Sequence, residues 1–456
     1  MKDPTKGLFR WVLGILIALF VVMIPALIAV GSTVPLAELS GSLLSSLVST
    51  ETVYIMLFFC LAVVLAALTL SIFVFWLAKP LFRKWMLERK ERKRLTRSQS
   101  RFSGLKQMDE MLKKAEKPTF TDPQLQQICV DFRNFAASKL GLYYEIADIR
   151  RFIAGLGISR LVILRGMSGT GKTSLAYAAG EYFGNSSTIV PIQPMWKERS
   201  DILGYFNEFT KRFNETKLLS KLYEAGGTDY VYITVLDEVN IARIEYYFAE
   251  FLSLLEIPDP SKRMIDVVAD SWPSDPARIV GGKLQLPENM WFVGTANNDD
   301  STFSISDKVY DRAMILDLER KCQPFDAPET PPACLSFRNL LEKFESAKQS
   351  AFLTEQARKA LSQLDDHLTE VFRISFGNRI MRQIEEYVPV MIACGGTQND
   401  ALDDILARKI LRKLEQVSPV LLRSQIPALL QMLDELFGKD VMVQSQEYLN
   451  RLLNNV

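Results

Sequence analysis

The sequence predicts an α/β protein, in which a parallel-sheet domain follows two membrane-spanning helices and precedes a block of helices. Three observations favour this fold class. Residues 161–164 are an apolar run that leads through Arg165 into a glycine-rich loop and then into an alanine-rich helical pattern. The acid pair Asp237-Glu238 follows a second apolar run, as at the end of a buried strand. Two stretches near the N-terminus, 11–30 and 53–78, contain no charged residue.

Both uncharged stretches are long enough to cross a bilayer as a helix. The connection between them, 31–52, has no Lys or Arg, whereas basic residues precede the first stretch and follow the second. Because basic residues tend to stay on the cytoplasmic side, we expect a two-pass protein of a bacterial-type inner membrane with both termini and the main domain in the cytoplasm. The alternative for stretch 11–30 is a cleaved signal peptide, which would leave 53–78 as an anchor in the same orientation.

Residues 79–101 are strongly basic, with ten Lys or Arg residues against two acids. A segment of this kind next to a membrane span is attracted to anionic lipid, so we expect a helical stalk with membrane lipid as a partner. Direct binding of nucleic acid is the alternative, which the formal net charge of +1 for the whole chain does not favour. A polar linker is predicted over 102–122. The expected domains are a two-helix membrane segment at 1–80, a stalk and linker at 81–122, an α/β domain at 123–324 and a helical region at 325–456.

The glycine-rich loop has the form G-x-x-x-x-G-K-T, and a predicted strand and helix flank it as a phosphate-binding loop requires. Its glycines let the backbone approach an anion closely, and its N–H groups, with the start of the helix, cradle phosphates. Lys172 would reach the β- and γ-phosphates, and the hydroxyl of Thr173 would bind Mg²⁺. The alternative is a glycine-rich turn that matches by chance. The residues expected to hold the nucleotide are Gly166, Met167, Ser168, Gly169, Thr170, Gly171, Lys172, Thr173 and Ser174.

Acids at the carboxyl end of a buried parallel strand face the phosphates of a bound nucleotide. Asp237 is therefore predicted to hold Mg²⁺, and Glu238 to polarise the attacking water as a general base. An Asp-Glu pair by itself is more often the solvated start of a helix, but this pair follows an apolar strand pattern. A further apolar run, 290–295, leads to Asn297, whose amide could orient the attacking water.

Histidine and cysteine chemistry is nearly excluded by composition. The chain has one histidine, His367, and five scattered cysteines of which no two have the spacing of metal ligands. Unpaired cysteines are typical of reduced thiols in the cytosol.

Residues 125–420 resemble the AAA+ ATPases, and more closely the branch that holds the MoxR-type ATPases and the motor subunit of the McrBC restriction system. The resemblance rests on the loop, on the acid pair within 235–243, and on the strand tip 292–298. It implies an α/β domain with a C-terminal helical lid that assembles into a ring, expected to be a hexamer. It also implies that the hairpin expected at 204–213 faces the central pore.

The same resemblance assigns three further residues. Asn297 matches the sensor-1 position. Arg312 matches the arginine finger, which reaches into a neighbouring subunit's site. Arg379 looks like the sensor-2 arginine of the lid, which contacts the γ-phosphate of its own chain. The DNA-binding module of the restriction motor is absent, and two predicted spans stand in its place.

The function that we expect is therefore that of a membrane-tethered ring ATPase that remodels or drives a partner protein. One alternative is the motor of a defence system that acts with a separate nuclease or effector. A second is a nucleotide switch that assembles and scaffolds other proteins without hydrolysis. ATP is the default nucleotide, GTP remains an alternative, and Mg²⁺ is the expected metal.

Overall fold

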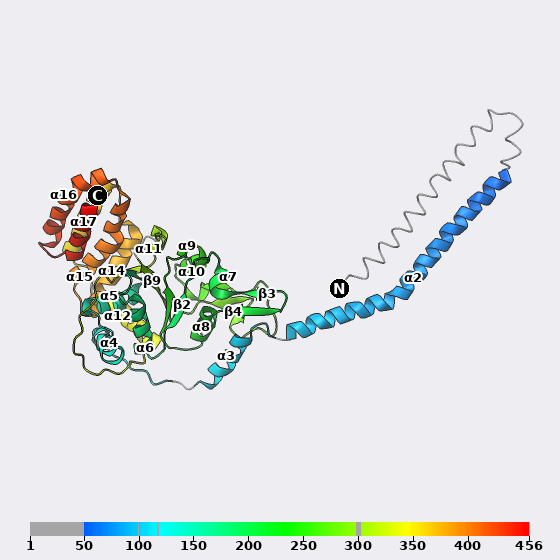
Figure 1. The fold of residues 1–456 in the computed structure, drawn as a ribbon, viewed down its shortest axis with the longest axis horizontal. Coiled ribbons are helices and arrows are strands. Elements are labelled where there is room, and N and C mark those ends of the chain that lie inside the picture. The colour runs from blue at the N-terminus through cyan, green and yellow to red at the C-terminus, as the bar shows by residue number, and fades with distance from the viewer. Residues whose placement is uncertain (1–49, 99, 116–117, 298–301, 456) are drawn as a thin grey trace, which may run out of the picture. The chain divides into compact units, whose positions relative to one another are not determined.

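The computed structural model of the chain describes residues 50–98, 100–115, 118–297 and 302–455 (Figure 1). The first expected span, 11–30, lies outside the described residues. The chain divides into two compact units, one that ends at Thr96 and one that begins at Arg97.

The described part of the first unit belongs to one long helix, α2 (Thr50–Ser98), which continues through Pro80 into the basic segment and ends at the second residue of the second unit. Within the described part of the chain, Leu61–Lys84 is the one stretch that is long and apolar enough to cross a membrane, with a mean hydropathy of 2.6. It begins several residues later than the predicted second span, 53–78.

The second unit is built on a five-stranded parallel sheet with the strand order β10-β1-β9-β5-β2. The loop strand β1 lies between β9 and β10, and β9 separates it from the acid strand β5. Parallel strands of this kind are apolar on both faces because helices cover both. The strands are β1 (Leu161–Gly166), β2 (Thr188–Pro191), β5 (Tyr232–Asp237), β9 (Met290–Asn297) and β10 (Met314–Asp317).

Alternate side chains of β1 enter two different cores. Val162 and Leu164 join one core, and Leu161 and Ile163 join the other. The first core contains α4 (Leu125–Leu140), α5 (Ile146–Ile158), α6 (Lys172–Tyr182) and the C-terminal helices. The second contains α7 (Arg199–Leu203), α8 (Lys217–Ala225), α9 (Ile244–Tyr247) and α10 (Ala249–Leu254).

The C-terminal region is helical from Phe337 onward and shares the first core with the sheet, so it has no separate hydrophobic centre. Its helix α14 packs against α5 (Figure 1). The helices are α12 (Phe337–Ser350), α13 (Glu355–Phe372), α14 (Gly377–Ala393), α15 (Gln398–Ile405), α16 (Pro419–Phe437) and α17 (Val443–Asn455). A π-helical turn, Leu406–Ile410, and a 3₁₀ segment, Leu411–Gln416, follow α15. A short helix, α11 (Asp307–Tyr310), precedes β10.

Two small antiparallel elements lie outside the main sheet. The expected hairpin is present as β3 (Gly204–Asn207) and β4 (Arg212–Glu215). A three-stranded sheet of β6 (Met264–Asp266), β8 (Lys283–Gln285) and β7 (Ile279–Val280) was not predicted.

The segment predicted as a polar linker, 102–122, is partly built into the second unit. Within it, α3 (Ser103–Lys114) packs against α8. Phe102 and Leu105 are fully buried, and the carboxylate of Glu215 accepts hydrogen bonds from the first N–H groups of α3. The linker expectation was wrong for this part because Phe102 and Leu105, together with the partly buried Met108, join the second core.

Candidate nucleotide-binding site

The glycine-rich loop joins β1 to α6, as the motif predicts. Gly166 has φ +154°, and a Cβ built there would lie 2.3 Å from the carbonyl oxygen of Leu318, just beyond β10. Gly171 has φ +92°, and its carbonyl accepts a hydrogen bond of 3.0 Å from the hydroxyl of Tyr144. Burial raises the pKa of Tyr144, so this hydroxyl stays protonated as a donor. The loop is thus supported from behind by β10 and by the residues that precede α5.

Lys172 is buried at the base of the loop. Its ammonium donates hydrogen bonds to the carbonyl oxygens of Gly166 (3.0 Å) and Met167 (2.6 Å). A buried ammonium is costly without such partners. The outer loop residues Met167, Ser168 and Gly169 are exposed. An anion that enters the loop would therefore meet exposed backbone with a positive charge beneath it.

Asp237 joins the acid strand to the loop helix. One of its carboxylate oxygens accepts a hydrogen bond of 2.8 Å from the hydroxyl of Thr173, in the first turn of α6. The same oxygen accepts a second bond of 2.8 Å from the hydroxyl of Thr295 on β9. Thr173 and Asp237, the two predicted metal ligands, are therefore in direct contact.

Thr295 was missed by the sequence reasoning, and it connects both acids. It is 2% exposed, and its hydroxyl oxygen accepts a hydrogen bond of 2.9 Å from the backbone N–H of Glu238. The signal in the sequence is slight: one hydroxyl side chain two residues before the strand-tip asparagine. The sequence does not show that β9 lies beside β5, so it could not show that Thr295 faces the acid pair.

Glu238 has the left-handed φ of +56°, which is uncommon for a residue with a side chain. The bond to Thr295 and a bond of 2.8 Å from the N–H of Val239 to the carbonyl of Thr295 hold the backbone in this conformation. Strain of this kind persists where surrounding contacts impose it, and it is frequent at functional sites.

Asn297 lies at the tip of β9, opposite Gly166 in the sheet register. Its side-chain amide is 3.5 Å from a carboxylate oxygen of Glu238. The buried side chain of Asn240 donates a hydrogen bond of 2.9 Å to the carbonyl of Asn297 and so fixes the strand tip. The structure therefore brings Lys172, Thr173, Asp237, Glu238 and Asn297 together at one edge of the sheet.

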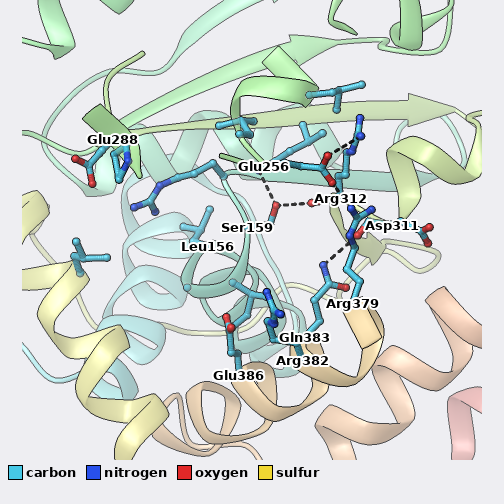
Figure 2. A pocket seen from close by; sticks show the side chains of 18 of the residues that line it. Leu156, Ser159, Glu256, Glu288, Asp311, Arg312, Arg379, Arg382, Gln383 and Glu386 are labelled. Atoms are coloured by element: carbon cyan, nitrogen blue, oxygen red, sulfur yellow. Dashed lines mark hydrogen bonds and ion pairs between the residues drawn. The ribbon is translucent and has the colours of Figure 1, made fainter. Parts of the chain in front are cut away.

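Arg312 lies at the other end of the strands. Its carbonyl accepts a hydrogen bond of 2.8 Å from the hydroxyl of Ser159, which precedes β1, whereas the loop follows β1. Because a strand rises about 3.3 Å per residue, the six residues of β1 separate these ends by roughly 20 Å. Arg312 lines a pocket of about 590 Å³ that Figure 2 shows from close by.

Arg379 lies in the same pocket, at the start of α14. Its guanidinium forms an ion pair with Glu256, and the other carboxylate oxygen of Glu256 pairs with Arg312 at 2.7 Å (Figure 2). From the resemblance we expected Arg379 to reach the γ-phosphate of its own chain, but this structure places it beside Arg312. The reason is that α14 packs on α5, so that the first turn of α14 lies where β1 begins.

Residues 335–456 match a family model described as a domain of unknown function (DUF8727). No curated protein matches the sequence. A solved structure of a candidate ATPase from Cytophaga hutchinsonii is similar over 72% of this chain and 96% of that one, at 12% identity and a TM-score of 0.45. A full-length MCM homolog from Methanopyrus kandleri is similar over 67% of this chain and 62% of that one, at 13% identity and a TM-score of 0.36.

Proposed function

We propose that the protein is a membrane-anchored ATPase that hydrolyses ATP at contacts between its own subunits and uses the cycle to remodel or drive a partner protein. One observation carries this proposal. The hydroxyl groups of Thr173 and Thr295 both bond to Asp237, and Thr295 also bonds to Glu238. These bonds join the loop, the acid pair and the strand tip into one connected group.

The residues present fit a magnesium ion. Mg²⁺ prefers oxygen ligands, and the hydroxyl of Thr173 and the carboxylate of Asp237 lie 2.8 Å apart. When bound, the ion would neutralise charge on the transferred phosphate group. Glu238 would accept a proton from the attacking water, and Asn297, whose amide lies 3.5 Å from that carboxylate, would keep the carboxylate and the water in line.

Lys172 would exchange its carbonyl partners for phosphate oxygens. Its ammonium now bonds to two backbone carbonyls of the loop, which are neutral acceptors. Charge-assisted bonds to phosphate are stronger than bonds to neutral carbonyls. This exchange would favour nucleotides that carry β- and γ-phosphates, ATP first and GTP as the alternative.

Arg312 and Arg379 would act on the site of a neighbouring subunit. They lie near Ser159, at the far end of β1 from the loop of their own chain, so neither can reach the phosphates that this loop would hold. An arginine supplied from another chain stabilises charge in the transition state of phosphoryl transfer. The resulting assembly is a ring of identical chains, and we carry the expectation of six subunits over from the resemblance to AAA+ ATPases.

The membrane placement rests on α2 and on the sequence pattern. The apolar stretch Leu61–Lys84 would cross a bacterial-type inner membrane, with 11–30 as the first span. The basic residues that follow it would lie against anionic lipid on the cytoplasmic side. The partner protein would then be engaged at the inner face of the membrane.

The test is nucleotide turnover by the full-length protein in detergent. We expect Lys172→Ala and Arg312→Ala each to reduce turnover to a small residual rate, roughly 1,000-fold or more below that of the unaltered protein. Mixing the two variants should restore it partly, because about a quarter of the interfaces in a randomly mixed ring would join an intact loop to an intact arginine. If the mixture showed no more turnover than either variant alone, the proposal that Arg312 acts on the site of a neighbouring subunit would be overturned. Assembly on ATP without turnover by the unaltered protein would favour the switch.

A further inference from the structure

Glu256 holds both arginines of the pocket with one carboxylate. One oxygen accepts from Arg312 at 2.7 Å, and the other pairs with Arg379 (Figure 2). The three side chains come from distant parts of the sequence: the turn after α10, the residue that follows α11 by two positions, and the first turn of α14. No residue pattern in the sequence pointed to Glu256.

Hydrogen bonds and packing support the backbone around this group. The carbonyl of Arg312 accepts from Ser159, and the carbonyl of Asp311 accepts a bond of 3.1 Å from Gln383. Glu256 follows α10, whose Phe251 is fully buried. By contrast, the side chains of Glu256, Arg312 and Arg379 are 33%, 26% and 52% exposed.

The charges explain why a carboxylate is present. Two guanidinium groups held this close repel each other unless a negative charge lies between them. Glu256 supplies that charge, and among the described residues it is the one side chain that accepts a hydrogen bond from the Arg312 guanidinium. An arginine has five N–H donors, so the pair keeps the capacity to bind a further anion.

We propose that Glu256 is a positioning residue that holds Arg312 and Arg379 as a pair for the triphosphate of a neighbouring subunit. This rests on the proposed function, in which both arginines act between subunits. In the free subunit the carboxylate is the anion that the two guanidinium groups share. In the assembly, the phosphate oxygens of the neighbour's nucleotide accept hydrogen bonds from the N–H groups that Glu256 does not use. Because Glu256 already orients both guanidinium groups, they need no rearrangement to bind the phosphates.

The test compares Glu256→Gln with Glu386→Gln in the full-length protein. Glu386 lines the same pocket and pairs with Lys348 at 3.6 Å, so its variant makes the same charge change away from the arginines. We expect Glu256→Gln to lower kcat for ATP roughly 10- to 100-fold, the size of effect that a small misplacement of a catalytic group produces. We expect Glu386→Gln to leave kcat unchanged and both variants to keep the KM of the unaltered protein.

A second comparison separates positioning from a general loss of structure. Adding Glu256→Gln to an Arg312→Ala, Arg379→Ala protein should change its residual turnover little, because Glu256 then has nothing to position. Glu256→Asp keeps the charge on a shorter side chain, so its kcat should lie between that of the unaltered protein and that of Glu256→Gln. If the Gln substitution lowered kcat equally in both backgrounds, or not at all in the unaltered one, the inference would be overturned while the ATPase assignment stood. Absence of turnover in the unaltered protein would overturn both.

Discussion

Arg101 is joined to Asp275 by two parallel hydrogen bonds, from Nε at 2.9 Å and from Nη2 at 2.8 Å. The same guanidinium pairs with Asp270 at 2.8 Å and lies 4.6 Å from the ring centre of Trp272. Arg101 is 2% exposed although it belongs to the basic segment of the sequence. The residues that follow α2 are thus fixed to the loop between β6 and β7.

We expect Arg101→Ala to lower the free energy of unfolding by about 3 to 5 kcal/mol, since it leaves Asp275 buried without its partner. Arg101→Lys should recover only part of this stability. It keeps the positive charge beside Asp275, but an ammonium cannot form both parallel bonds. Denaturant unfolding followed by tryptophan fluorescence would measure this, with the exposed Lys106→Ala as the control. Equal stability of Arg101→Ala and Lys106→Ala would contradict the expectation.

Thr295→Val should impair turnover and leave nucleotide binding intact. The valine keeps the shape of the side chain but removes the bond to Asp237 and the acceptor for the N–H of Glu238. Because Glu238 would lose its orientation as a general base, we expect kcat to fall roughly 100-fold. The matched control is Thr234→Val, which makes the same change at a buried position on the adjacent strand β5. If both substitutions lowered kcat alike, Thr295 would have no special role.

Gly166→Ala should abolish nucleotide binding. A Cβ at this position would lie 2.3 Å from the carbonyl oxygen of Leu318, a contact that neither backbone can relieve without moving. Gly155→Ala is the control, because a Cβ there would meet only ordinary contacts, 3.5 Å from Met314. Helix α5 would even gain several tenths of a kcal/mol from the alanine. The measurement is the affinity for a fluorescent ATP analogue, and unchanged affinity in Gly166→Ala would contradict the prediction.

Lys409 should make the stability of the protein depend on pH. It is buried, and its ammonium donates a hydrogen bond of 2.5 Å to Gln383. Burial lowers its pKa to about 7. The charges of Arg379 and Lys413 lower this pKa further, whereas those of Asp311 and Asp404 raise it. In the unfolded chain the pKa of a lysine is about 10.4. Between these values the unfolded state binds more protons, so the free energy of unfolding should rise with pH by up to about 1.4 kcal/mol per unit. Below about pH 7 both states are protonated and this contribution is constant.

Lys409→Met should remove this dependence, because methionine cannot be protonated. Urea unfolding across the interval from about pH 7 to pH 10 would show a flatter profile for Lys409→Met than for the unaltered protein. The exposed Lys439→Met is the control and should keep the slope. Parallel profiles for all three proteins would mean that Lys409 does not titrate in this interval.

The backbone of the glycine-rich loop could be predicted because its residues are contiguous. The motif at 166–174 specifies its own backbone, and the apolar runs before Gly166 and Asp237 identify two parallel strands without further information. Asn297 could be predicted for the same reason, since it follows an apolar run at a strand tip. For these residues, the neighbouring sequence is enough to determine the local structure.

The positions of Arg379 and Glu256 could not be predicted, because they depend on how helices pack and not on spacing along the chain. The sequence shows that Arg379 begins a helix but not which end of β1 that helix approaches. Glu256 follows an amphipathic helix and has no pattern of its own. The sheet β6–β8–β7 was not predicted for another reason. Its strands have only two or three residues, too few to show an alternation of apolar and polar side chains.

The two ends of β1 also restrict how copies of the chain can assemble. A subunit that offers its loop at one end and its arginine pair at the other presents two different surfaces. A two-fold dimer joins identical surfaces, so it would bring arginine pair to arginine pair or loop to loop and complete no site. Contacts that complete a site must run head to tail, and such contacts either close into a ring or continue as a filament. The membrane anchor that we propose would keep every subunit on the same side of the bilayer, which favours closure about an axis perpendicular to the membrane plane.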